Sequence, residues 1–166
     1  AENLLIQGLP RADRQALLAV CEPVELVLSE VLVERGQATR EVYFPIDAFV
    51  SLLTQVDSHA ALEVGMVGRE GMVGVNLALG VSAAPLRALV QGTGAAWRIP
   101  APAFGRQLAR SAPLRSTLNR YLYVLMAQQS ESAACLRYHL IGQRLARWLL
   151  MTQDRAHADQ FHVTHE

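Results

Sequence analysis

The chain contains no lysine: all 15 of its basic residues are arginine. It therefore cannot form a lysine Schiff base, nor hold a nucleotide with the lysine of a phosphate-binding loop. The sequence also lacks the Ser-His-Asp orders typical of hydrolases and a His-Glu-x-x-His motif. Acid pairs such as Glu63 with Glu70 flank a strand end and a turn, which is typical of solvated side chains. We therefore expect a protein that is not an enzyme.

Cysteine is scarce, since Cys21 and Cys135 are the two in the chain and lie far apart in it. Two thiols are too few for a disulfide scaffold, a four-ligand metal site or an iron–sulfur cluster. Both are more typical of small buried side chains, while Cys21 and His59 are of the types that can ligate haem iron. The histidine-rich stretch 154–166 offers no convergent geometry, so we expect no metal site and no certain cofactor.

Long apolar runs are also absent. No stretch approaches the roughly 20 residues that a membrane-spanning helix needs, so we expect a cytoplasmic protein with no membrane partner. Disorder is excluded as well, because 51% of the residues are hydrophobic and the mean hydropathy is +0.17. A length of 166 residues suits one domain with a small appendage.

A formal net charge of zero conceals two oppositely charged halves. Residues 1–83 contain five Arg and 11 Asp or Glu, whereas residues 84–166 contain ten Arg and four Asp or Glu. An excess of cations is typical of a half that faces nucleic acid, because phosphates attract them. A solvated helix face is the alternative interpretation of the charge alone.

The spacing of apolar residues changes along the chain. Residues 10–20 have helical periodicity opened by a proline, and a helical turn at 73–79 and a helix at 100–110 follow later. Between and after them, short β-rich runs separated by turn residues predict strands at 24–28, 31–34, 42–44, 49–54, 60–67, 86–91 and 95–99. Regularly spaced short strands favour a rolled antiparallel sheet over βαβ units, and hence an α+β fold.

A long helix is predicted from Ser111, a plausible N-cap, because no Gly or Pro occurs between 114 and 141. Its apolar residues follow the 4-3 spacing of a coiled coil, with a second apolar line beside the first. One line can pack on the chain's own sheet while the other meets a second copy, so we expect a parallel homodimer; a helix docked within one chain is the alternative. The expected interface residues are Leu114, Leu118, Tyr121, Leu122, Leu125 and Met126.

A further helix is predicted over Arg137–Gln153, with Arg137, Arg144 and Arg147 on the side opposite its apolar residues. Residues 161–163 read as a strand, and Thr164 as the N-cap of a helix that begins just before residue 166. We expect the three arginines and Thr164 to lie close to DNA.

This order of elements resembles the Crp/Fnr superfamily of bacterial transcription regulators. The resemblance rests on VLVERG (31–36), VYFP (42–45), VSL (50–52), GREGMVG (68–74) and QRLARWLL (143–150). It implies a cyclic-nucleotide-binding-like β-roll, of the double-stranded β-helix or jelly-roll type, over residues 1–110. A dimerisation helix over 111–136 and the first part of a winged helix-turn-helix over 137–166 would follow. The recognition helix would lie beyond residue 166, where promoter DNA and RNA polymerase would be partners.

The resemblance also locates an expected effector pocket. Family members that bind cyclic AMP hold the ribose with a Gly-Glu pair and the phosphate with an Arg-Ser or Arg-Thr pair. Here Met72 follows Gly71, and Ala84-Pro85 occupy the phosphate-binding position, with Arg87 three residues on. We therefore expect cyclic AMP to bind poorly and a different effector to be possible. The pocket residues are Glu70, Gly71, Met72, Val73, Gly74, Ala84, Pro85, Arg87 and Tyr121, the last covering a ligand or packing at the interface.

Three functions stay open at this point. The first is the sensing and dimerisation portion of a regulator, in which an effector changes the pairing of two long helices. The second is a dimerisation scaffold that needs no ligand. The third is a stand-alone small-molecule-binding module, which the arginine-bearing helix and the helix entry at Thr164 disfavour.

Overall fold

The computed structural model describes residues 2–55 and 60–156. Its strands are β1 (Glu22–Leu26), β2 (Val31–Val33), β3 (Glu41–Pro45), β4 (Phe49–Thr54), β5 (Leu62–Val67), β6 (Arg87–Gly92) and β7 (Gly94–Pro100). Its helices are α1 (Leu4–Gln7), α2 (Arg11–Leu18), the 3-10 helix η1 (Val75–Leu79), α3 (Ala101–Arg110), α4 (Ala112–Tyr138) and α5 (Ile141–Ala156). None of the helices in this part of the chain is long and apolar enough to cross a membrane.

Two antiparallel sheets form the roll, and the expectation of an α+β fold is confirmed. One sheet has the order β1-β7-β3 and the other the order β2-β6-β4-β5. Alternating apolar residues of both sheets fill the space between them, which is why short strands with period-two patterning suffice. This inner core contains Leu26, Tyr43, Ala48, Val50, Val67, Val73, Ala88, Val90 and Ala96.

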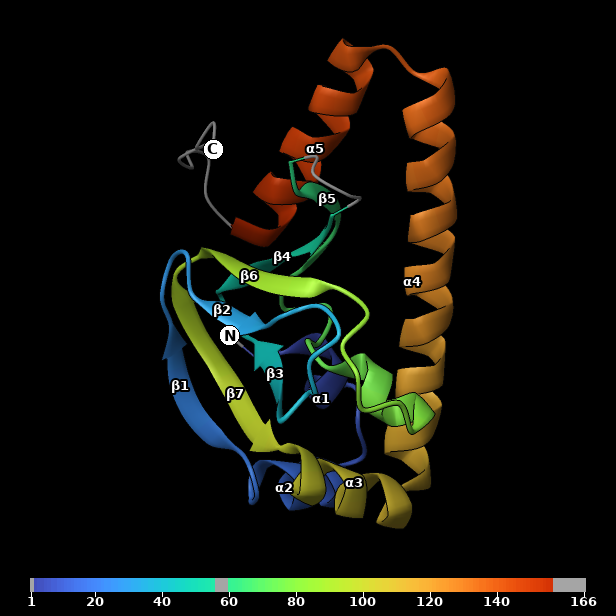
Figure 1. Ribbon diagram of the computed structural model, residues 1–166. Helices are drawn as coiled ribbons and strands as arrows, with labels where there is room; N and C mark the ends of the chain where they lie inside the picture. The colour runs from blue at the N-terminus through green and yellow to red at the C-terminus, as the bar shows by residue number, and fades with distance from the viewer. Residues whose placement is uncertain (1, 56–59, 157–166) are drawn as a thin grey trace.

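A second core lies between the roll and the helices. It combines side chains from α1, α2, β3, β7, α3 and the first half of α4, including Ile6, Leu17, Phe44, Ile99, Phe104, Leu114 and Leu118. Figure 1 shows α2 and α3 at the base of the roll and α4 standing along one side of it. The helices therefore cover the base and one flank of the roll, and α4 extends well past it.

The apolar stripe at the start of α4 belongs to this core and not to a dimer interface. Leu114 is 1% exposed, Leu118 is 0% exposed, and Tyr121 is 8% exposed. Leu125 is partly buried against the same cluster. The roll of the same chain therefore covers Leu114, Leu118 and Tyr121, which corrects their assignment to the dimer interface, whereas Leu125 is covered only in part.

The ends of the last two helices also differ from the prediction. Helix α4 is capped by Ser111 as expected, since its Oγ accepts a hydrogen bond of 3.0 Å from Leu114 N. However, α4 ends at Tyr138 and α5 begins at Ile141, with an extended backbone at His139 between them. Helix α5 then returns toward the roll (Figure 1). Arg137 therefore belongs to the last turn of α4 and not to the second helix.

The short helix α1 was not predicted, because four residues are too few for a periodic signal. Asn3 fixes it by two sets of contacts. Its Oδ1 accepts hydrogen bonds from Leu5 N and Ile6 N at the start of the helix. Its Nδ2 donates to Pro45 O at 2.9 Å and to Gly71 O at 2.8 Å. The fully buried Asn3 thus joins the N-terminus to the loop that follows β5.

Gly71 fits against the ring of Tyr121 so closely that a Cβ atom there would collide with the phenol oxygen. We expect Gly71→Ala to lower the free energy of unfolding by about 1–3 kcal/mol, as overpacking does. Gly105→Ala in α3 is the matched control, because no atom lies within 4 Å of the position that its Cβ would take. Alanine there should raise stability by up to about 1 kcal/mol through helix propensity. Urea denaturation followed by circular dichroism measures both, and two equal effects would contradict the close contact.

Candidate functional site

The loop 68–74, expected to line an effector pocket, is itself packed into the two cores. Met72 is 1% exposed and belongs to the helix-side core, while Val73 is 3% exposed and belongs to the inner core. Met72 N donates a hydrogen bond of 3.2 Å to Tyr121 Oη. Gly74 has φ +92°, a conformation that favours glycine, and begins η1. Met72 and Val73 therefore support the roll and do not present their side chains to a ligand.

Ala84 and Pro85, at the position expected for a phosphate-binding pair, are held by main-chain hydrogen bonds of Ala84 to the segment 36–37. Ala84 is 3% exposed; its N donates to Gln37 O at 2.8 Å, and its carbonyl accepts from Gly36 N at 2.8 Å. Pro85 is exposed and has no N–H to donate. The one backbone N–H of this pair, that of Ala84, is thus already engaged and not free for an anion.

Arg87 lies in β6 and is paired with Glu34, the residue that follows β2. Its Nε is 3.3 Å from Glu34 Oε1, and both side chains are partly exposed. The cation needed for a phosphate is therefore present near the expected place but already has an acidic partner.

Glu70 instead holds the last helix. Arg155, at the end of α5, is 7% exposed, and both its Nε and Nη2 lie 2.8 Å from Glu70 Oε1. The same carboxylate oxygen accepts from Gly68 N at 3.2 Å. Charge-assisted hydrogen bonds of this kind are about twice as strong as neutral ones. We call the Glu70–Arg155 pair the clasp, because it fastens α5 to the loop beside Tyr121.

Two further contacts hold α5 against β5, at Thr152 and Trp148, one and two helical turns before Arg155. Trp148 Nε1 donates to Glu63 Oε1 of β5 at 2.8 Å. The buried Thr152 Oγ1 donates to Trp148 O at 2.9 Å and lies 4.0 Å from Met66 Sδ. Sequence reasoning missed the return of α5, although 148, 152 and 155 share one helical face, which was the available signal.

Tyr121 stands at the centre of these contacts. Burial raises the pKa of its phenol well above the ordinary value. The hydroxyl therefore stays protonated at all physiological pH values and acts as acceptor and donor to Met72. Glu70 and Tyr121 line a hollow of about 270 Å³ between the roll and α4, together with Leu5, Met66, Thr117, Arg120, Val124, Leu125 and Gln128.

The residues expected near DNA are spread over different places. Arg137 is exposed on α4 and lies over the ring of Tyr138, with its Cζ 5.4 Å from the centroid. Arg144 and Arg147 are half-buried and line a groove between α4, α5 and β5. Arg144 and Arg147 therefore share the groove with Leu145 and Trp148, whereas the sequence predicted that they lie on the side of the helix opposite its apolar residues. Thr164 and the strand expected at 161–163 lie outside the described residues.

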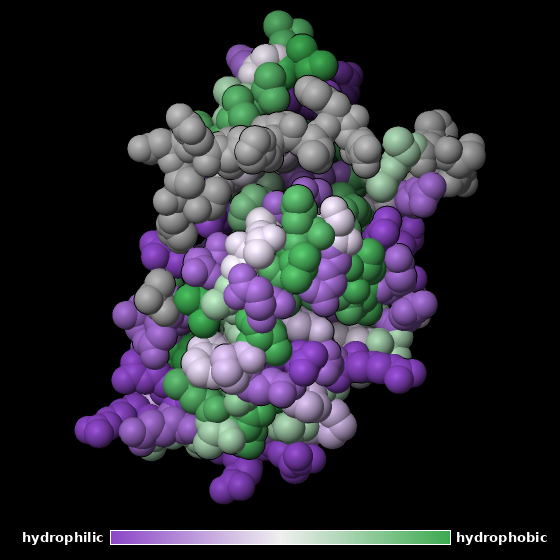
Figure 2. Space-filling view, turned by 90° about the vertical axis from the view of Figure 1, so that its left-hand side faces the viewer, coloured by the Kyte–Doolittle hydropathy of each residue, from purple (hydrophilic) through white to green (hydrophobic). Residues whose placement is uncertain are grey.

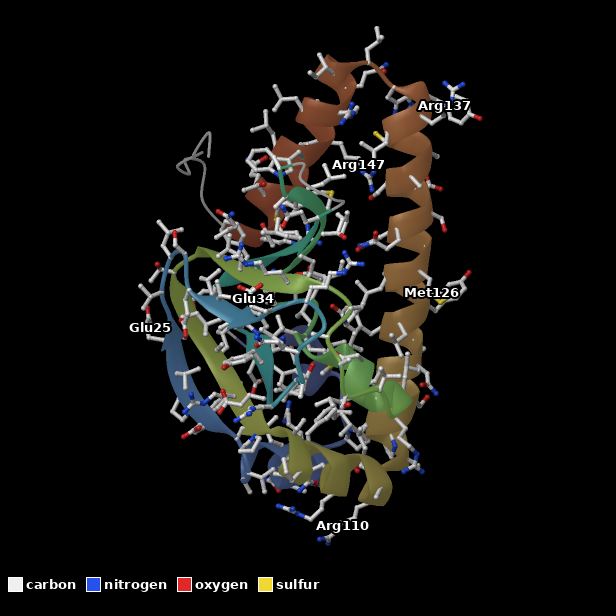
Figure 3. The ribbon with its side chains drawn as sticks, viewed as in Figure 1. Glu25, Glu34, Arg110, Met126, Arg137 and Arg147 are labelled. Atoms are coloured by element: carbon white, nitrogen blue, oxygen red, sulfur yellow. The ribbon has the colours of Figure 1, made fainter. Side chains whose placement is uncertain are left out.

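Two large apolar side chains on the outer side of α4 are exposed in the part of the chain that the structure describes. Met126 is 69% exposed and Tyr123 is 74% exposed. Figure 3 shows Met126 pointing away from the roll. Leu122, one turn before Met126, is half-buried. Of the six residues expected at the dimer interface, Met126 is exposed, and Leu122 and Leu125 are partly buried.

The two cysteines are free thiols. Burial raises the pKa of Cys21 to about 12, so its thiol is protonated at neutral pH and a poor nucleophile. Cys135 is buried at the end of α4, with its Sγ 3.2 Å from His139 Nδ1. Across residues 2–55 and 60–156, no group of three His, Cys, Asp or Glu side chains is placed to hold a metal ion. His59 lies outside the described residues.

The clasp predicts unequal effects of two arginine substitutions. Arg155→Gln should lower the free energy of unfolding by about 1.5–3 kcal/mol, because it leaves the Glu70 carboxylate without its charged partner. Arg14→Gln is the matched control: Arg14 forms a partly exposed pair with Glu2 at 3.8 Å, of a kind worth about 1 kcal/mol or less. Urea denaturation measures both variants. Equal losses would show that the clasp contributes no more than a surface ion pair.

No protein-family model and no curated protein sequence matches this chain. Solved structures do. The c-di-GMP responsive global regulator CLP of Xanthomonas campestris superposes with a TM-score of 0.73 at 15% identity, covering 90% of this chain and 75% of that one. FixK2 of Bradyrhizobium japonicum gives a TM-score of 0.70 at 11% identity, covering 82% and 67%.

The catabolite activator protein of Thermus thermophilus gives a TM-score of 0.61 at 14% identity, covering 80% of this chain and 62% of that one. At such identities the likeness establishes the fold. The chain thus has the fold of a cyclic-nucleotide-binding-like domain with a long helix, similar in structure to the effector domains of Crp/Fnr-type regulators.

Proposed function

We propose that this chain is the effector-sensing and dimerisation portion of a bacterial Crp/Fnr-type DNA-binding transcription regulator. The observation that carries the proposal is the combination of the roll with a helix of 27 residues on which Tyr123 and Met126 are exposed among the described residues. At 1.5 Å per residue the helix is about 40 Å long, more than the roll needs for its own cover. The structural likeness to CLP, FixK2 and the catabolite activator protein supports the same function.

The proposed dimer contact uses the outer side of α4. Burying an apolar side chain such as that of Met126 stabilises an interface by about 1.5–3 kcal/mol. Tyr123 adds aromatic area, and such residues are enriched in interface cores. A change in the roll would reach the dimer contact through Tyr121. This residue belongs to the same helix, α4, and its hydroxyl is hydrogen-bonded to Met72 in the loop 68–74. In a dimer, a small change in the angle between two such helices would alter the spacing of two DNA readers.

Dimerisation is the test of this proposal. We expect the chain to be a dimer in size-exclusion chromatography with light scattering at tens of micromolar. Met126→Glu should shift it toward the monomer by placing like charges in the interface. Val27→Glu is the matched control, because Val27 is a 57% exposed apolar residue. It directly follows β1, which lies on the side of the roll opposite α4 (Figure 1). A monomeric wild-type chain, or equal effects of the two variants, would contradict the proposal.

The second part of the proposal is that cyclic AMP is not bound in the usual way. Each missing charge-assisted hydrogen bond forfeits about 1.5–3 kcal/mol. We therefore expect cyclic AMP and adenosine to bind equally weakly in calorimetric titrations, because no donor set is available for the cyclic phosphate. Low-micromolar affinity for cyclic AMP, with much weaker binding of adenosine, would show that Arg87 leaves Glu34 to hold the phosphate.

A further inference from the structure

The groove between α4, α5 and β5 has the construction of a second ligand site. We propose that it binds an amphipathic organic anion, with an apolar body in the groove and a carboxylate, sulfonate or phosphate group on Arg144 and Arg147. The site lies outside the effector pocket expected in the loop 68–74 and at 84–87. It therefore goes beyond the proposed function and does not depend on it.

Three elements form its walls and enclose about 470 Å³. Strand β5 contributes Leu62, Glu63, Val64 and Gly65; α4 contributes Gln129, Ser132, Ala133, Cys135 and Leu136; and α5 contributes Ile141, Arg144, Leu145, Arg147, Trp148 and Met151. Small-molecule sites in proteins have this size and this mixture of apolar walls with a few polar groups. The groove can thus accept an organic molecule of about the size of a naphthalene derivative or a medium-chain acid.

Charge selects the ligand class. Among the described residues, no acidic side chain forms an ion pair with Arg144 or Arg147. Figure 3 shows Arg147 in the space between α5 and α4. The acid in the walls, Glu63, is already engaged: Oε1 accepts from Trp148 Nε1 at 2.8 Å, and Oε2 accepts from Ser51 Oγ. Two arginines that form no ion pair within residues 2–55 and 60–156, beside an apolar surface, favour an anion over a neutral or cationic ligand.

The groove is held in place before any ligand binds. Gln129 Nε2 donates to Val64 O at 2.9 Å, which joins α4 to β5. The Trp148–Glu63 hydrogen bond and the clasp fix α5 on the other side. A site whose walls are fixed in advance avoids part of the ordering cost of binding. A ligand that contacts all three elements would also stabilise their arrangement by mass action.

Exposed apolar surface elsewhere is the competing explanation for any binding of an apolar probe. Tyr138 is 78% exposed and Leu140 is 80% exposed at the turn between α4 and α5, and neither lines the groove. Figure 2 shows apolar side chains gathered at this tip of the molecule. The experiment must therefore separate the groove from the tip.

Two fluorescent probes of one shape provide the test: 1-anilinonaphthalene-8-sulfonate, an anion, and N-phenyl-1-naphthylamine, its neutral counterpart. We expect the anion to bind the wild-type chain at one site and to be displaced by decanoate but not by decyltrimethylammonium. The double variant Arg144→Gln/Arg147→Gln should weaken binding of the anion by about tenfold or more and leave the neutral probe within about twofold. Arg137→Gln, an exposed arginine outside the groove, should bind both probes as the wild type does.

A blocking variant locates the site. Ala133 is an exposed residue of α4 in the groove wall, so Ala133→Phe should exclude both probes without disturbing the core. Circular dichroism checks that each variant is folded. Unchanged anion affinity in the double arginine variant, or displacement by decyltrimethylammonium as readily as by decanoate, would overturn the proposal. So would several bound probes that Ala133→Phe does not affect, which would place them on the apolar tip. The assay uses neither DNA nor dimerisation, so its failure would leave the proposed function standing.

Discussion

The burial of the first half of α4 against the roll is the contact on which the rest of the structure depends. Leu114 and Leu118 fill the helix-side core, and Tyr121 places its phenol against Gly71 and Met72. This leaves the helix two unequal sides, one committed to the chain's own roll and one free. The direction of α4, the position of the loop 68–74 and the side on which a second copy can bind all follow from that division.

The predicted strands and the long helix could be derived from the sequence because their signals are local. Period-two patterns broken by turn residues indicated seven strands close to their observed bounds. The N-cap at Ser111 could be recognised because its hydrogen-bond partner, Leu114 N, is only three residues away in the sequence. An apolar pattern does not show which surface its side chains pack against. The 4-3 spacing from Leu114 to Leu125 correctly indicated a buried stripe, but the roll and a second helix would leave the same pattern.

The candidate site was less predictable for the same reason. The absence of a Glu after Gly71 and of an Arg-Ser pair at 84–85 could be read directly, whereas the partners of Glu70, Glu63 and Arg87 are distant in the sequence. Glu70 illustrates the difference well. It was grouped with the effector pocket because of its place beside Gly71, yet its carboxylate is used by an arginine 85 residues further on.

The hydrogen bond from Gln129 to Val64 has a consequence for how copies of the chain can meet. Strand β5 is an outer strand of its sheet, and such strands can pair with a strand of another molecule and start aggregation. Here the side-chain amide of Gln129 in α4 donates a hydrogen bond to the main-chain carbonyl of Val64 in β5. Helix α5 also contacts this strand, through Trp148 and Glu63. A strand of a second molecule therefore cannot easily pair with β5. Copies of the chain are then expected to associate through side-chain contacts and not through main-chain pairing of their sheets.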